Sequence, residues 1–114
     1  MWHSRRKAKQ LERYRGNISH DTDIDTLIKT IESGVNINVL YHVGWCGHCK
    51  YTFPTFVNFC SDKNLNFATC DMTNVSRKNN ITGFPTIHKY INGQMVKEII
   101  GGISHVDQLN ALLE

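Results

Sequence analysis

The feature that most constrains the fold is a near-continuous run of apolar, largely β-branched residues over positions 35–43. A strand with one wet face alternates apolar and polar residues, so a run of this kind predicts a strand that is covered on both faces. Such strands belong to parallel or mixed sheets with helices on either side. The run leads directly into Gly44, and apolar residues at helical spacing follow over 53–60. We therefore expect a central strand followed at once by a helix.

Two further segments would flank this strand. Apolar residues at helical spacing over 24–31 predict an amphipathic helix, with Asp21 or Thr22 as its N-cap and Gly34 just past its end. Positions 65–70 predict a second strand.

A β-hairpin is predicted near the C-terminus. Two β-rich runs, 85–91 and 95–100, are joined by Asn92-Gly93, the dipeptide that best suits a two-residue type I′ turn. Between the second strand and this hairpin, 74–79 is expected to form a short polar helix or turn. A first strand around Ile18 is a further expectation.

A terminal helix is expected after the hairpin. Ser104 and Asp107 resemble a capping box. The buried stripe of this helix would be Val106, Leu109, Leu112 and Leu113. The order of the elements predicts an α/β fold, with a central mixed β-sheet flanked by helices.

The formal charge of +3 is concentrated in the first sixteen residues. Six basic residues and one acid give this segment a charge of +5, whereas seven basic and nine acidic residues leave the other ninety-eight at −2. We therefore expect residues 1–16 to be a flexible basic extension and 17–114 to be one folded domain. The alternatives for the extension are a helix packed on the domain and a contact with nucleic acid or an anionic surface through Arg5-Arg6-Lys7. Elsewhere no nucleic-acid contact is expected.

Cys46 and Cys49 are the candidates for chemistry. A thiol attacks a disulfide only as its thiolate, and Cys46 would lie at a helix N-terminus, where unpaired backbone N–H groups favour an anion. His48 can add a positive charge nearby. Because Cys49 is three residues further along the helix, its sulfur would lie close to that of Cys46. We therefore expect Cys46 to be the nucleophile and Cys49 the resolving thiol.

A structural zinc site is the alternative use of such a pair. It would need two more ligands, but Cys60 and Cys70 are ten residues apart and no two histidines have a paired spacing. We expect Cys60 and Cys70 to be buried core thiols and the chain to hold no metal.

The segment Trp45-Cys46-Gly47-His48-Cys49-Lys50, with Phe84-Pro85-Thr86 downstream, resembles the thioredoxin superfamily in its protein disulfide isomerase form. The resemblance covers roughly residues 17–114. It implies a thioredoxin fold in which Pro85 has a cis peptide bond and lies beside the cysteine pair. It also implies that the backbone of Phe84 pairs with an extended substrate, and that Trp45, Gly47 and the Gly101-Gly102 turn complete the groove.

The resemblance also implies a function. Histidine at position 48 marks the isomerase type, whereas reducing thioredoxins have proline there. We expect an oxidase-like or isomerase-like oxidoreductase for protein disulfides, monomeric, with no cofactor beyond its own dithiol. Its partners would be protein thiol or disulfide substrates and an upstream thiol oxidase or reductase. The alternatives are a general protein-disulfide reductase and a binding module that makes little use of its cysteines.

The sequence departs from the family pattern at three positions. Relatives usually have a buried acid six residues before the first cysteine, where this chain has Leu40, and the lysine that pairs with that acid is replaced by Thr69. Thr82 stands where isomerases tend to carry an arginine. We expect slower release of mixed disulfides, unless His42, which shares the strand parity of Leu40, relays protons instead.

The expected compartment follows from two opposing observations. Charged residues fill positions 5–9 and no run approaches the roughly 20 apolar residues of a spanning helix, so neither a secretory signal nor a membrane span is expected. Isomerase-type motifs, in contrast, suit oxidising compartments. We expect a thiol-oxidising pathway in the cytoplasm, such as a viral one, with the ER lumen as the alternative.

Overall fold

A four-stranded mixed sheet forms the centre of the fold. The computed structural model describes residues 21–76 and 80–114. The strands have the order β2-β1-β3-β4, and their bounds are Ile37–His42 (β1), Phe67–Asp71 (β2), Thr86–Ile91 (β3) and Gln94–Ile100 (β4). Strand β1 is parallel to β2 and antiparallel to β3, which is antiparallel to β4. The central, buried position of β1 agrees with the prediction for the 35–43 run.

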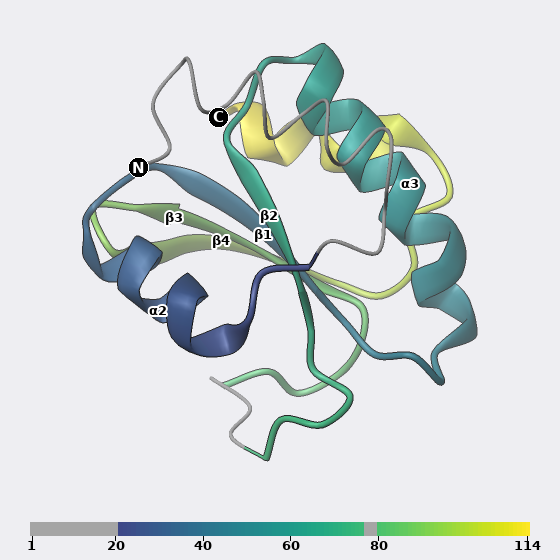
Figure 1. The fold of residues 1–114 in the computed structure, drawn as a ribbon. Coiled ribbons are helices and arrows are strands. Elements are labelled where there is room, and N and C mark those ends of the chain that lie inside the picture. Colours follow the sequence, from purple (N-terminus) through teal and green to yellow (C-terminus); the bar gives the residue numbers. More distant parts are fainter. Residues whose placement is uncertain (1–20, 77–79) are drawn as a thin grey trace.

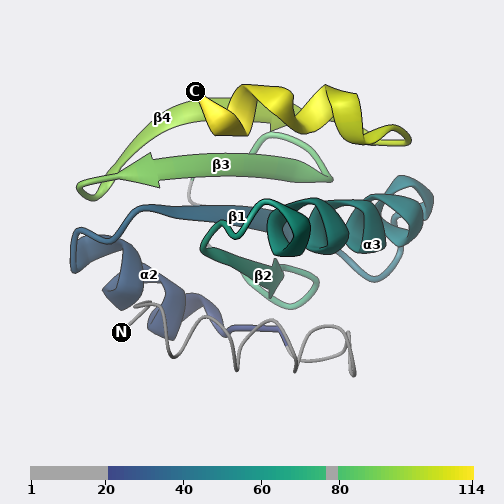
Figure 2. The same ribbon diagram turned by 90° about the horizontal axis from the view of Figure 1, so that it is seen from above.

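Helices cover both faces of this sheet. Helix α2 (Ile24–Glu32) lies on one face, and α3 (Gly47–Asp62) lies on the other with a C-terminal 3₁₀ helix, η1 (Val106–Leu113) (Figures 1 and 2). Each face has its own apolar core. The expected α/β class, a thioredoxin-type arrangement of a mixed sheet between helices, is confirmed. The strand expected around Ile18 lies outside the described residues, and the segment expected at 74–79 lies partly outside them.

The N-cap of α2 differs from the prediction. Asp23 is the cap, and its carboxylate accepts a hydrogen bond of 3.0 Å from the Thr26 N–H. Asp21 and Thr22, the expected caps, lie before it, and the Asp21 side chain is used elsewhere. The predicted end of the helix is confirmed, since Gly34 has a φ of +88° and donates its N–H to the carbonyl of Ile31.

The hairpin between β3 and β4 has the predicted turn. Asn92 and Gly93 have φ angles of +53° and +81°. Two successive positive φ angles are what a type I′ turn requires, and asparagine and glycine tolerate them best.

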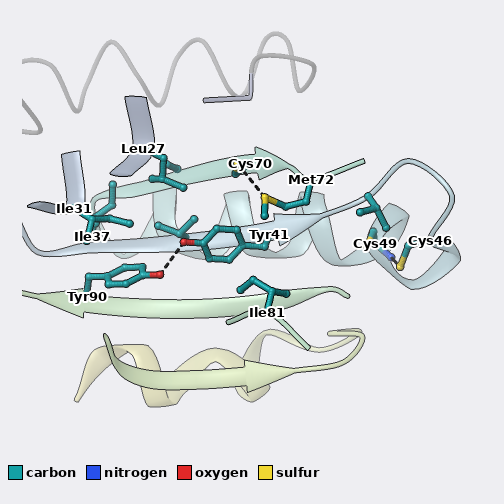
Figure 3. Packing of buried hydrophobic residues seen from close by; sticks show 13 residues of the cluster. Leu27, Ile31, Ile37, Tyr41, Cys46, Cys49, Cys70, Met72, Ile81 and Tyr90 are labelled. Carbon is teal, nitrogen blue, oxygen red and sulfur yellow. Dashed lines mark hydrogen bonds between the residues drawn. The ribbon is translucent and has the colours of Figure 1, made fainter. Parts of the chain in front are cut away.

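A polar chain is buried beneath β3, on the α2 side. The hydroxyls of Tyr41 and Tyr90 are 2.7 Å apart (Figure 3). The Tyr90 hydroxyl also lies 2.9 Å from Nδ1 of His88. The other ring nitrogen of His88 lies 2.8 Å from the Glu98 carboxylate. Each of these four polar side chains thus has a hydrogen-bond partner, which offsets the cost of burying it.

The C-terminal helix differs from the expected one in its cap and in its type. His105 rather than Ser104 is the N-cap: its ring accepts the Asp107 N–H at 3.3 Å, and the Gln108 side chain accepts the His105 N–H at 3.0 Å. A 3₁₀ helix has three residues per turn, so Leu109 and Leu112 lie on one line and are both buried. Val106 and Leu113, two of the four residues of the expected stripe, are exposed.

Among the described residues, no helix combines the length and apolar character needed to cross a bilayer.

Two of the leucines of η1, one buried and one exposed, provide a test of this register. We predict that Leu109→Ala lowers the free energy of unfolding by about 2–5 kcal/mol, because Leu109 is fully buried and its truncation leaves a cavity. The matched variant Leu113→Ala should cost less than about 0.5 kcal/mol, since this side chain is 47% exposed. Urea denaturation of both variants measures the difference, and equal losses would show that the register is wrong.

Candidate active site

The sulfur of Cys46 is the capping group of α3. Strand β1 ends at His42, and after a short turn Cys46 takes the N-cap position with extended backbone angles. The Cys49 N–H points at the Cys46 sulfur across 3.2 Å (Figure 3). A backbone donor and the positive end of the helix dipole therefore converge on this sulfur, and both favour its thiolate. The same hydrogen bond brings the two cysteines together, as expected from their spacing.

The proline loop lies directly beside the cysteine pair. The peptide bond between Phe84 and Pro85 is cis. The Cys46 thiol donates to the Phe84 carbonyl at 3.7 Å, and Gly101, with a φ of +108°, donates its N–H to the Pro85 carbonyl at 2.9 Å. Residues from three distant parts of the chain thus meet around Cys46.

Trp45 contributes an exposed apolar surface next to this loop. Its side chain is 74% exposed and its ring meets the Phe84 ring edge-on, with centroids 6.4 Å apart. Gly47 is the first residue of α3, and a Cβ atom there would meet no other atom within 4 Å. The structure therefore places all the expected groove residues around the cysteine pair.

The other three thiols are in environments that favour the protonated form. Burial, the hydrogen-bonding contact with Cys46 and the charges of Cys46 and Asp71 raise the pKa of Cys49 to about 12, although the Val43 backbone acts in the opposite direction. Burial raises the pKa of Cys60 as well, and burial with nearby carboxylates raises the pKa of Cys70 to about 12. Cys60 and Cys70 are completely buried, as expected of core thiols.

His48 is held by contacts that the sequence did not reveal. Its Nδ1 lies 2.7 Å from the Tyr51 hydroxyl. That hydroxyl occupies the space of a side chain at position 102: a Cβ atom on Gly102 would lie 2.3 Å from it. Thr52, one residue further, donates its hydroxyl to the His48 carbonyl and accepts the Ile103 N–H. The first turn of α3 is therefore fastened to the loop after β4, and this arrangement depends on glycine at position 102.

A second set of contacts fixes the turn before Cys46. The Asp71 carboxylate accepts hydrogen bonds from the backbone N–H and the hydroxyl of Thr73, and that hydroxyl accepts the Gly44 N–H at 2.7 Å. Burial tends to raise the pKa of Asp71, but the Thr73 hydrogen bonds and the charge of His42 outweigh it and lower the pKa. The end of β2 thus holds the turn that leads into the active-site helix.

The positions of the missing acid and lysine are occupied differently from the family pattern. Leu40 is fully buried in the core beneath α3. The hydroxyl of Thr69 donates to the Asp21 carboxylate at 2.6 Å, and the same carboxylate oxygen lies 2.7 Å from Nε2 of His42. A histidine and an aspartate therefore stand beside the position where relatives carry a buried ion pair. The described residues contain no group of three or more side chains that could bind a metal.

The thiol environments predict selective alkylation. Iodoacetamide at neutral pH should modify Cys46 well before the other three cysteines, because only the Cys46 sulfur receives helix N-terminal stabilisation. The rate at Cys49 should rise with pH up to its pKa of about 12, because only the thiolate reacts. Peptide mapping by mass spectrometry measures both rates. Labelling of Cys49 as fast as Cys46 at pH 7 would contradict this assignment.

Comparisons with known proteins agree with the fold and the site. A family model described as Thioredoxin matches residues 15–114. A thioredoxin from Coprinus comatus is 31% identical over 87 residues, which cover 70% of this chain and 81% of that protein. Protein disulfide-isomerase erp38 of Neurospora crassa is 32% identical over 108 residues, which cover 86% of this chain but only 28% of that protein.

Solved structures show the same relationship. The crystal structure of Chlamydomonas reinhardtii thioredoxin f2 matches with a TM-score of 0.68 and 25% identity, over 82% of this chain and 91% of that one. Because the relatives include both thioredoxins and disulfide isomerases, they support thiol–disulfide exchange without separating reduction from isomerisation. This chain belongs to the thioredoxin family, whose members carry out redox chemistry with their own cysteine pair and need no external cofactor.

Proposed function

We propose that this protein donates and rearranges disulfides in protein substrates through Cys46 and Cys49. The observation that carries the proposal is the position of the Cys46 sulfur at the N-cap of α3, with His48 in the first turn of the same helix. Both features stabilise the thiolate of the reduced pair. A reduced form that is more stable makes the disulfide form more oxidising.

The reaction proceeds by two exchanges between thiols and disulfides. A substrate thiolate attacks the Cys46 sulfur of the oxidised pair, the bond between Cys46 and Cys49 breaks, and its electron pair leaves on Cys49, which takes up a proton. A second substrate thiolate then attacks the substrate sulfur and displaces Cys46 as a thiolate. The substrate loses two electrons in forming its disulfide, and the cysteine pair gains them. Release of Cys46 is favoured because its thiolate is stabilised.

The proposed substrate site is the surface around the proline loop. Trp45 is exposed beside Phe84, and the neighbouring Ile100 side chain is also exposed. An extended segment of an unfolded or partly folded substrate would pair with the Phe84 backbone while its apolar side chains contact Trp45. The carbonyl of Phe84 already accepts the Cys46 thiol, so a substrate bound there would have its sulfur close to the nucleophile.

A general protein-disulfide reductase is the second candidate, because the similarity to thioredoxins is as strong as the similarity to isomerases. In that case the same exchanges run in reverse and a reductase regenerates the dithiol. The position of His48 favours the oxidising direction. An upstream thiol oxidase would then restore the disulfide.

The reduction potential of the pair distinguishes the two candidates. In a background in which Cys60 and Cys70 are alanine, titration against glutathione should give a value nearer the roughly −180 mV of protein disulfide isomerase than the roughly −270 mV of thioredoxin. His48→Pro should lower it by tens of millivolts, because the first turn of α3 loses a side chain that can carry a positive charge. His105→Asn, which replaces an exposed histidine far along the chain, is the matched control. A parent value near that of thioredoxin would instead indicate a reductase.

A further inference from the structure

The resolving cysteine needs a proton acceptor. Cys49 must lose its proton before it can attack a mixed disulfide on Cys46, yet its side chain is only 4% exposed. The position at which relatives carry an acid for this purpose is Leu40, which packs in the apolar core with Phe53 and cannot exchange protons.

His42 lies close to the first turns of α3. It is two residues after Leu40 and therefore leaves β1 on the same face of the sheet. Its ring meets the Phe53 ring edge-on, with centroids 5.0 Å apart. Phe53 is four residues after Cys49 and so lies one turn below it on the same face of the helix. The imidazole therefore packs on the side chain one turn from the resolving thiol, and Asp71 interacts electrostatically with both His42 and Cys49.

The Asp21 carboxylate sets the state of this imidazole. It lies 2.7 Å from Nε2 of His42 and is itself held by the Thr69 hydroxyl. Because a carboxylate only accepts, Nε2 carries the proton, and in the neutral ring Nδ1 keeps a free lone pair. The side chains of His42 and Asp21 are 13% and 19% exposed, so the pair is shielded from water but still reachable by it.

We propose that His42, oriented by Asp21, accepts the proton of Cys49 when Cys49 resolves a mixed disulfide on Cys46. The inference rests on the proposed function. The proton passes from the Cys49 thiol through a bridging water to Nδ1, the Cys49 thiolate attacks the Cys46 sulfur, and the substrate thiolate leaves with the electron pair of the broken bond. The imidazolium then returns the proton to that thiolate, so the step is balanced. Asp21 is a positioning residue in this scheme.

The charges around the imidazole favour this role. Asp21 faces it from the segment before α2, and Asp71 lies within electrostatic range at the end of β2. Two carboxylates therefore face the ring that would take up the proton. Within the described part of the chain, neither His42 nor Asp21 has a Lys or Arg as its hydrogen-bond or ion-pair partner.

The two steps can be separated in a stopped-flow experiment. An aromatic disulfide such as 5,5′-dithiobis(2-nitrobenzoate) reacts with Cys46 and releases one coloured thiolate, and attack by Cys49 then releases the second. The rate of the second phase is independent of reagent concentration because it is intramolecular. The proteins compared carry alanine at Cys60 and Cys70, and the added changes are His42→Gln and Asp21→Asn, with His105→Asn as the matched histidine control.

We expect His42→Gln to slow the second phase about tenfold or more near neutral pH and to leave the first phase unchanged. In the parent the second-phase rate should rise through the titration of a histidine and then level off, whereas in His42→Gln it should follow the hydroxide concentration. Asp21→Asn should also slow the second phase, because an amide no longer requires Nε2 to carry the proton and so does not keep Nδ1 available as the acceptor.

Two results would overturn the proposal: an unchanged second phase in His42→Gln, or an equal slowing of both phases, which would indicate a general disturbance of the site. A parent that shows the first phase but never the second would instead overturn the proposed function itself, because no disulfide between Cys46 and Cys49 would then form.

Discussion

The hydrogen bond from the Cys49 N–H to the Cys46 sulfur is the interaction on which the rest of the site depends. It exists because β1 ends at His42 and α3 begins five residues later, at Gly47, with Cys46 as the N-cap. A thiolate in that position is stabilised by the helix itself. The resolving cysteine, one turn further, is buried, and burial helps to raise its pKa to about 12, so it is protonated at neutral pH. One helix terminus thus gives the two cysteines different roles.

The surrounding structure keeps this terminus in place. The turn before Cys46 is held by Asp71 and Thr73, and the turn after it by Thr52 and Tyr51. The proline loop closes the remaining side through the Phe84 carbonyl. The two apolar cores on either face of the sheet position the elements from which these contacts come. The contacts that hold the N-terminus of α3 in place therefore surround the reactive cysteine at the C-terminal end of β1.

Much of this arrangement could be predicted from the sequence because it rests on local patterns. The apolar run of β1, the Asn92-Gly93 turn and the cysteine pair at a helix start each follow from residue type and spacing. Contacts between distant residues could not be found in this way. Asp21 was expected to cap α2, but its carboxylate is instead bound by Thr69 and lies beside His42, both of which are brought near it only by the sheet. The cap of η1 was misplaced by one residue because histidine is an uncommon N-cap.

The central claim is that Cys46 forms a mixed disulfide with the substrate. Cys49 then attacks this mixed disulfide and releases the substrate. The most direct test is to trap that product by mixing the reduced Cys49→Ser variant with a protein substrate that contains a disulfide, so that the Cys46 thiolate displaces one substrate thiolate, followed by alkylation and non-reducing electrophoresis. The account predicts that Cys49→Ser accumulates a covalent complex through Cys46, that the parent shows little of it, and that Cys46→Ser shows none. A complex formed equally by Cys46→Ser, or the absence of any complex in Cys49→Ser, would contradict it.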